Sequence, residues 1–190
     1  MSVTRVALIA ILMAVPANSQ RRPDDPAVKD FNDRVQQYWD LHKNIEDKAP
    51  PIDKKKESDP AAIVAHEQAL ANGIRASRKN AAEGDIFTPA AAKSFLAMIH
   101  QALSSGRGEA ARGLVLGEGN PENPESAAKI DLMVNGKYPP RAPLSTMPPS
   151  LLLNLPKLPE GLEYRFVGRN LILYDSKANL IVDILRNAIR

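Results

Sequence analysis

The sequence predicts an α+β protein in which amphipathic helices precede a small C-terminal antiparallel sheet. Over residues 24–117 apolar side chains recur at spacings of three and four, the period of one helix face. Between Leu162 and Leu185 three short apolar runs are separated by polar breaks at 168–170 and 175–179. Such runs, bounded by Gly, Asn, Asp and Ser, are typical of strands joined by tight turns. We therefore expect a three-stranded antiparallel meander at the C-terminal end.

Length and composition favour one domain with a thin core. A chain of 190 residues can bury one modest core, and only 5% of the residues are aromatic, which favours Ala-rich helices over a large aromatic pocket. Sixteen prolines against ten glycines predict long irregular connections. We expect one domain over residues 24–190, made of a helical part at 24–117, a proline-rich strap at 118–161 and a β-meander at 162–190.

The first 20 residues have the pattern of an export signal. Arg5 supplies a positive charge, residues 6–15 are uninterruptedly apolar, and small residues precede a cleavage point after Ser19. Ten apolar residues span only about 15 Å as a helix, against roughly 30 Å of bilayer hydrocarbon, which favours a cleaved signal over a membrane anchor. We expect a helical signal peptide at 1–19, a short mature tail at 20–23, and a periplasmic or secreted protein with no stable membrane span.

Three helices are predicted to start by the same device, a capping side chain followed by proline, at Asp25, Asp59 and Thr88. The first should end before Pro50, because residues ahead of proline avoid helical geometry. The apolar pattern of the second helix ends within residues 75–80. We expect this helix to pair with the first as an antiparallel hairpin. The spacing assigns to one face of each helix the following residues: Val28, Phe31, Val35, Tyr38, His42 and Ile45, then Ile63, Glu67, Leu70 and Ile74, then Ala92, Phe95, Ile99 and Leu103, the last four as a buried stripe.

Weaker patterns predict the remaining elements. Residues 104–106 should end the third helix, and 109–116 is a weak candidate for a fourth, since glycine lowers helix stability by about 1 kcal/mol. In the strap, 130–134 is a candidate strand that ends at a turn at 135–136, and 149–155 should form one helical turn. We expect the rest of the strap to cross the domain surface as extended coil.

The strands indicate how the sheet is covered. Leu162, Tyr164 and Phe166 alternate with polar residues, so they should share one face. The runs 171–173 and 180–182 are apolar on both faces, which predicts that helices or the strap cover both sides of the sheet.

The C-terminal segment resembles that of small exported bacterial proteins of unknown function. The likeness lies in Leu-Pro-Glu-Gly-Leu-Glu-Tyr-Arg-Phe-Val-Gly at 158–168, Leu-Ile-Leu at 171–173 and Asn-Leu-Ile-Val-Asp at 179–183, with Asp-Ile-Phe-Thr-Pro at 85–89 in support. It is also similar, more distantly, to the terminal meander of periplasmic nickel/cobalt-homeostasis proteins. The resemblance implies a periplasmic location and an accessory role, and it transfers neither an active residue nor a metal site.

The sequence indicates no metal centre or nucleic-acid site. His42 and Glu46 lie four residues apart on a helix, but such a pair supplies two ligands where zinc needs at least three from protein. We interpret His42, His66 and His100 as ordinary surface or boundary residues. The absence of cysteine excludes disulfides, thiolate zinc sites and cysteine nucleophiles. The single basic run, at 54–56, is flanked by acidic residues and lacks interleaved aromatics, so we expect no nucleic-acid partner.

Catalytic patterns are equally sparse. No serine stands in a Gly-flanked nucleophile elbow, and the glycines of 113–119 carry neither a phosphate-loop lysine nor dinucleotide spacing, so a flexible loop is expected there. Asp175 should cap backbone amides in a turn. Asp183 interrupts an apolar run, so it either faces solvent or pairs with Arg165 or Arg169 across the sheet. We favour a structural ion pair, and Asp183 with Arg165 is the candidate functional surface.

These patterns predict a non-catalytic exported accessory or interaction protein of the bacterial envelope, with no cofactor and with an envelope protein or surface as its partner. One alternative is a periplasmic accessory protein that binds a small ligand or a metal. A second is an envelope hydrolase, which needs a concave site with clustered titratable residues.

Overall fold

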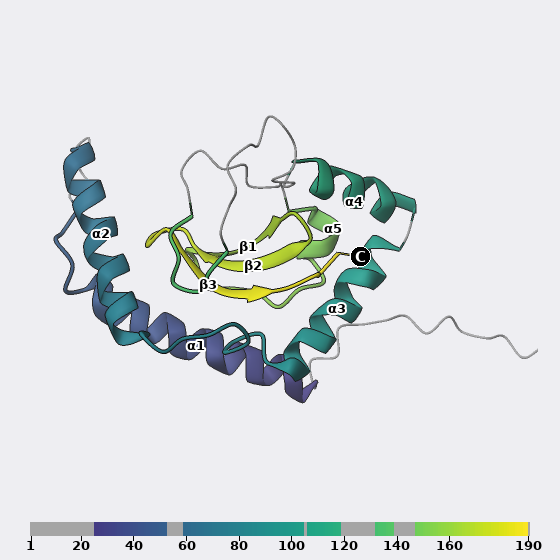
Figure 1. Cartoon of the computed structure of the whole chain (residues 1–190), viewed down its shortest axis with the longest axis horizontal. Helices are drawn as coiled ribbons and strands as arrows, with labels where there is room; N and C mark the ends of the chain where they lie inside the picture. The colour runs from purple at the N-terminus through teal and green to yellow at the C-terminus, as the bar shows by residue number, and fades with distance from the viewer. Residues whose placement is uncertain (1–24, 53–58, 105, 119–131, 139–146, 190) are drawn as a thin grey trace, which may run out of the picture.

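A computed structural model of the chain describes residues 25–52, 59–104, 106–118, 132–138 and 147–189. It confirms the α+β class: helices surround a C-terminal three-stranded antiparallel sheet (Figure 1). The expected signal peptide, the basic run at 54–56 and much of the strap lie outside the described residues. Within the described part, no helix combines the length and the apolar character that crossing a bilayer requires.

Three helices begin at the predicted caps. They are α1 (Pro26–Glu46), α2 (Pro60–Ser77) and α3 (Pro89–Leu103). Asp25 Oδ1 accepts a hydrogen bond from the amide of Ala27 at 2.9 Å, and Asp59 Oδ1 accepts one from Ala61 at 3.0 Å. Each cap gives an N–H at the helix start a partner that the helix itself cannot provide.

The fourth helix is longer than its sequence suggests. It is α4 (Gly106–Glu118), and it includes Gly113 and Gly117, where we expected a flexible loop. That expectation was wrong. The side chains of Ala111 and Val115 pack against the main core, so tertiary contacts offset the low helix propensity of glycine.

The meander has the predicted strands and order. They are β1 (Leu162–Val167), β2 (Asn170–Asp175) and β3 (Leu180–Leu185), paired β1-β2-β3. Leu173 pairs with Tyr164 on one side and with Asp183 on the other. The register between β2 and β3 shifts near Leu173 and Tyr174, so that Val182 is an extra residue in β3.

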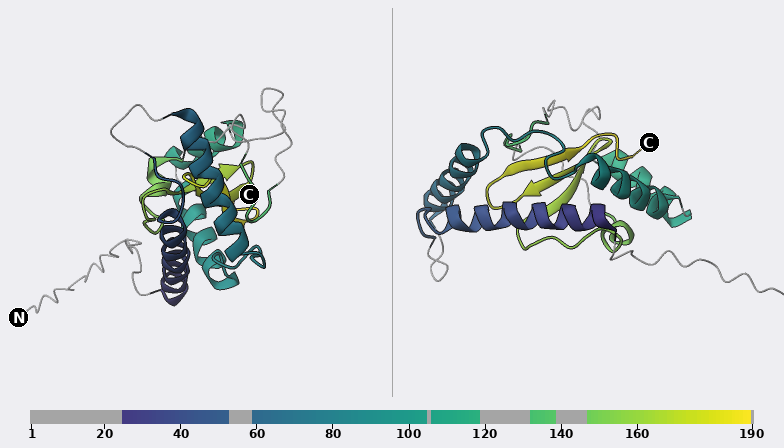
Figure 2. Two further views of the ribbon diagram at one scale, coloured as in Figure 1. Left: turned by 90° about the vertical axis from the view of Figure 1, so that its left-hand side faces the viewer. Right: turned by 90° about the horizontal axis from the view of Figure 1, so that it is seen from below.

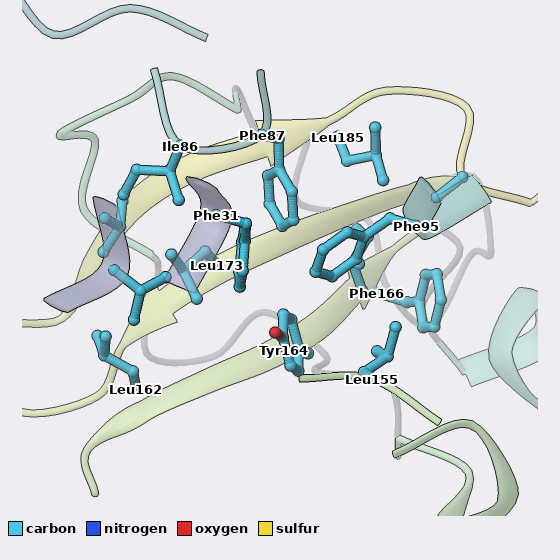
Figure 3. Packing of buried hydrophobic residues seen from close by; sticks show 14 of the residues in the cluster. Phe31, Ile86, Phe87, Phe95, Leu155, Leu162, Tyr164, Phe166, Leu173 and Leu185 are labelled. Atoms are coloured by element: carbon cyan, nitrogen blue, oxygen red, sulfur yellow. The ribbon is translucent and has the colours of Figure 1, made fainter. Parts of the chain in front are cut away.

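Both faces of the sheet are buried, as predicted. One face, with Tyr164 and Phe166, packs against α1 and α3 and contains an aromatic cluster (Figure 3). In this cluster the ring centroids of Phe31 and Phe95 are 4.6 Å apart, and those of Phe87 and Phe95 are 5.1 Å apart. On the other face, Leu132, Val134 and Tyr138 of the strap cover the following sheet residues: Val167, Ile172, Tyr174, Ile181 and Ile184.

The second helix does not form the predicted antiparallel hairpin. Figures 1 and 2 show α2 standing away from α1 at a steep angle, near the C-terminal end of α1. A Cβ atom at Gly73 would collide with Cγ2 of Ile45, so glycine permits this close crossing. Leu70 and Ile74 are buried there, but Ile63, assigned to the same face, is 44% exposed.

The described parts of the strap hold a short helix and a turn. The single turn predicted at 149–155 is present as α5 (Pro149–Leu152). The turn at Asn135 and Gly136 is confirmed by a 2.9 Å hydrogen bond from the amide of Gly136 to the carbonyl of Met133. Residues 132–134 are not a strand, and 130–131 lie outside the described residues. Strand-like pairing instead follows the turn, where Lys137 bridges to Leu180 of β3.

Candidate functional site

A buried polar cluster centres on Asp175, at the end of β2. Its Oδ2 accepts a 2.6 Å hydrogen bond from the hydroxyl of Tyr38 and lies 2.7 Å from Nδ1 of His42. Its Oδ1 accepts the amides of Lys177 and Ala178 at 3.1 and 3.0 Å, as expected for a capping turn residue. Asp175 and His42 are 0% exposed. The interpretation of His42 as a surface or boundary residue was therefore wrong.

Burial and charge fix the protonation of the phenol in this cluster. Burial raises the pKa of Tyr38 well above its ordinary value, and the neighbouring Asp175 carboxylate raises it further. Tyr38 therefore remains a hydrogen-bond donor to Asp175 throughout the neutral range. On its other side, the guanidinium of Arg78 lies 5.0 Å from the centroid of the Tyr38 ring.

The outer nitrogen of His42 faces a second carboxylate. Its Nε2 lies 3.3 Å from Oε2 of Glu46, within ion-pair range, but the two are not aligned as a hydrogen bond, and Nε2 is buried. The indole of Trp39 stacks on the imidazole, with centroids 4.3 Å apart. His42 is thus enclosed between Asp175, Glu46 and Trp39, and this conformation leaves no access for a substrate.

Glu46 links the cluster to the surface. It pairs with Nζ of Lys177 at 2.9 Å, and Lys177 also lies 5.6 Å from the centroid of the Trp39 ring. Partial burial alone would raise the pKa of Glu46, but the hydrogen bond and charge of Lys177, together with His42, outweigh it and lower that pKa. The cluster therefore ties the C-terminal half of α1 to the turn between β2 and β3.

The structure separates the two residues proposed as a functional surface. Asp183 is 0% exposed, and its carboxylate forms no ion pair with Arg165 or Arg169. Its Oδ1 accepts the amides of Gly84 and Ile184 at 2.9 and 2.7 Å, and its Oδ2 accepts those of Ile86 and Phe87, both at 2.7 Å. The expectation that Asp183 faces solvent or pairs with Arg165 or Arg169 was wrong.

Arg165 lies on the other face of the sheet from Asp183. Its neighbours in β1, Tyr164 and Phe166, face the aromatic cluster, so alternation directs Arg165 away from it. Its Nε donates to Oε2 of Glu163 at 2.8 Å. Asp183 therefore anchors the loop before α3, while Arg165 belongs to a local pair on β1.

A pocket of about 580 Å³ lies between α3, α4 and the residues that follow β3. The side chains that line it, among those the structure describes, are Leu96, Ile99, His100, Leu103, Ser104, Arg112, Ala188 and Ile189. Sequence reasoning missed this site. The predicted buried stripe of the third helix includes Ile99 and Leu103, but nothing local to the chain shows that α4 and the C-terminal residues leave a space beside it.

The other two histidines have local roles. Nδ1 of His66 lies 2.7 Å from the carbonyl of Pro50. Nδ1 of His100 lies 3.3 Å from Oγ of Ser104, whose hydroxyl donates to the carbonyl of His100 at 2.6 Å. In the part of the chain that the structure describes, no three His, Asp or Glu side chains form a group that could hold a metal ion.

Comparisons of the chain with protein-family models, with curated proteins and with solved structures found no match. The resemblance of the C-terminal segment to small exported proteins stays a prediction from the sequence.

Proposed function

We propose that this chain is a non-catalytic binding protein of the bacterial envelope. The observation that carries the binding role is the pocket between α3, α4 and residues 188–189. Of the described residues that line it, five are apolar and three are polar. Pockets for small molecules are mostly apolar, with a few polar groups that orient the ligand. Export is supported by the signal-like pattern of the first 20 residues.

Hydrogen bonding in the pocket favours binding over hydrolysis. A serine nucleophile needs a base positioned to take its proton. The hydroxyl of Ser104 donates to the carbonyl of His100, so its proton is not directed at the imidazole. No carboxylate among the described residues contacts His100 to orient it. Ser104 therefore acts as a cap at the end of α3.

Thermal unfolding in the presence of apolar ligands tests the binding role. A ligand at 100 times its Kd stabilises a protein by about 2.7 kcal/mol. For a domain of this size, that corresponds to a rise in Tm of roughly 5–10 °C. Leu96→Asn should abolish the rise, whereas Leu153→Asn, at a leucine that is 68% exposed and does not line the pocket, should keep it. No rise across the panel, or equal rises in both variants, would contradict the proposal.

A second candidate function, recognition of a partner protein, is favoured by the N-terminal half of α2. Ile63 and Val64 are 44% and 50% exposed on a helix that stands away from the sheet (Figure 1). A photo-crosslinker at Ile63 should give a discrete adduct in envelope extract, and one at Lys79 should not. The same adducts from both positions would count against this surface.

A further inference from the structure

We propose that Asn135 is a modification site, a position of spontaneous deamidation that the fold keeps closed and that opening of its turn exposes. Asparagine followed by glycine deamidates most readily, because glycine has no Cβ to hinder the attacking backbone nitrogen. The chain contains this dipeptide twice, at 72–73 within α2 and at 135–136 in the strap. The second one forms the turn that joins the strap to β3, so a chemical change there affects how the sheet is covered.

The reaction needs only water as a co-reactant. The backbone nitrogen of Gly136 loses its proton and attacks Cγ of Asn135, and the side-chain nitrogen leaves as ammonia. Water then opens the resulting five-membered succinimide at either of its two carbonyls. One opening leaves aspartate in place of asparagine. The other leaves isoaspartate, in which the main chain runs through Cβ and Cγ and is one atom longer.

Hydrogen bonds hold both reacting groups away from this path. The N–H of Gly136 donates to the carbonyl of Met133 at 2.9 Å, so the attacking nitrogen is engaged. The side chain of Asn135 is fixed at both ends by Arg78: its Nδ2 donates to the carbonyl at 2.8 Å, and its Oδ1 accepts from Nη1 at 3.2 Å. Rotation of Cγ toward the attacking nitrogen breaks both of these bonds.

Backbone hydrogen bonds fasten the same dipeptide to β3. The N–H of Asn135 donates to the carbonyl of Ile181 at 2.8 Å, and the N–H of Ile181 donates to the carbonyl of Gly136 at 2.9 Å. Asn135 has a φ of 61°, in the left-handed region that asparagine adopts more readily than most side chains. Deamidation therefore requires the turn to open, and its rate in the folded chain follows the fraction of open turn.

Both products weaken the closed turn. In isoaspartate the added main-chain atom lies between the N–H and the carbonyl that bond Ile181, so the two bonds cannot form together in the present register. In aspartate a carboxylate oxygen replaces Nδ2 and faces the carbonyl of Arg78, where two acceptors meet. The guanidinium of Arg78 still pairs with that carboxylate, so aspartate is the milder change. Deamidation thus loosens the attachment of the strap to β3.

Peptide mapping by mass spectrometry tests the gating on the purified chain, incubated at mildly alkaline pH with and without denaturing urea. In urea, Asn72 and Asn135 should deamidate at similar rates, whereas in buffer Asn135 should react more than about tenfold more slowly than in urea. Arg78→Gln should speed the reaction of Asn135 in buffer by roughly fivefold, the factor for one lost hydrogen bond. Lys79→Gln, at the exposed neighbouring lysine, should leave it unchanged.

Wild type in urea below its unfolding transition gives a second measure that needs no variant. The deamidation rate of Asn135 should rise in step with hydrogen exchange at the amide of Gly136. In the deamidated chain, separated by ion exchange, the amide of Ile181 should lose protection while that of Leu173 in the central strand keeps it.

Each step of the proposal has an outcome that overturns it. Deamidation of Asn135 as fast in buffer as in urea, or at a rate unrelated to exchange at Gly136, overturns the gating. Reaction of Asn72 in urea while Asn135 stays intact overturns the site itself. Full protection of Ile181 in the deamidated chain overturns the weakened attachment of the strap.

Discussion

Replacement of Asp183 by asparagine tests whether a buried carboxylate holds the loop before α3. Each of its oxygens accepts two backbone amides, and the residue is fully buried. Asparagine keeps one accepting oxygen and presents an NH₂ group in place of the other. In either orientation of the amide, two backbone N–H groups lose their acceptor and face another donor.

The expected loss of stability is large. Hydrogen bonds to a charged group contribute about 1.5–3 kcal/mol each, and a buried donor left without a partner costs about 1–3 kcal/mol. We expect Asp183→Asn to lower the free energy of unfolding by about 3–5 kcal/mol. Total stabilities of domains are roughly 5–15 kcal/mol, so the variant should be close to unfolding at 37 °C.

Urea denaturation followed by circular dichroism measures the loss, and hydrogen exchange assigns it to the loop. The amides of Gly84, Ile86 and Phe87 should lose protection well beyond the global change. Asp33→Asn is the matched control, because Asp33 is 56% exposed in an ion pair with Lys29 and should change stability by less than about 1 kcal/mol. A loss below about 1 kcal/mol in Asp183→Asn, with these three amides still protected, would refute the reasoning.

Three further variants test other contacts. Tyr38→Phe removes one hydrogen-bond donor to the buried Asp175 and should lower the free energy of unfolding in urea by about 1.5–3 kcal/mol. An unchanged free energy of unfolding would count against the cluster as an anchor. Gly73→Ala should destabilise the protein by about 1–3 kcal/mol, because the added methyl group collides with Ile45. In an Ile45→Ala background the same substitution should instead stabilise the protein by up to about 1 kcal/mol. A change of the same sign in both backgrounds would exclude the collision. The pKa of Glu46 is lowered in the folded state, so its contribution is complete above the unfolded pKa, near the ordinary 4.5, and is lost as pH falls through the folded value. The difference in unfolding free energy between wild type and Glu46→Gln should therefore shrink below pH 4.5, and a difference independent of pH would contradict this.

Local features of the fold were readable from the sequence. Asp25, Asp59 and Thr88 act on amides two or three residues away, and the meander depends on neighbouring strands joined by short turns. Such contacts join residues that are close together in the sequence, so a local sequence pattern can indicate them. The length of α4 was missed because packing of Val115 against the core outweighs the low propensity of its glycines.

The candidate sites depend on contacts between distant parts of the chain. Asp183 accepts amides 96 to 99 residues earlier, and Asp175 meets His42 across 133 residues. The position of His42 on the apolar face was visible from its spacing after Tyr38. The missing information was the identity of its partner, since periodicity gives the direction of a side chain and not what lies opposite. The pocket is a product of three packed segments, and no single segment indicates it.

The anchoring of α1 and of the loop before α3 by Asp175 and Asp183 has a consequence for how the chain folds. Both anchors, and the sheet surface that receives Phe31 and Phe95, lie later in the sequence than the helices they hold. A chain that ends before Leu162 offers these helices no sheet to pack against, and isolated helices of such length are only marginally stable in water. Tertiary packing of α1 and α3 must therefore wait until residues 162–185 have been synthesised.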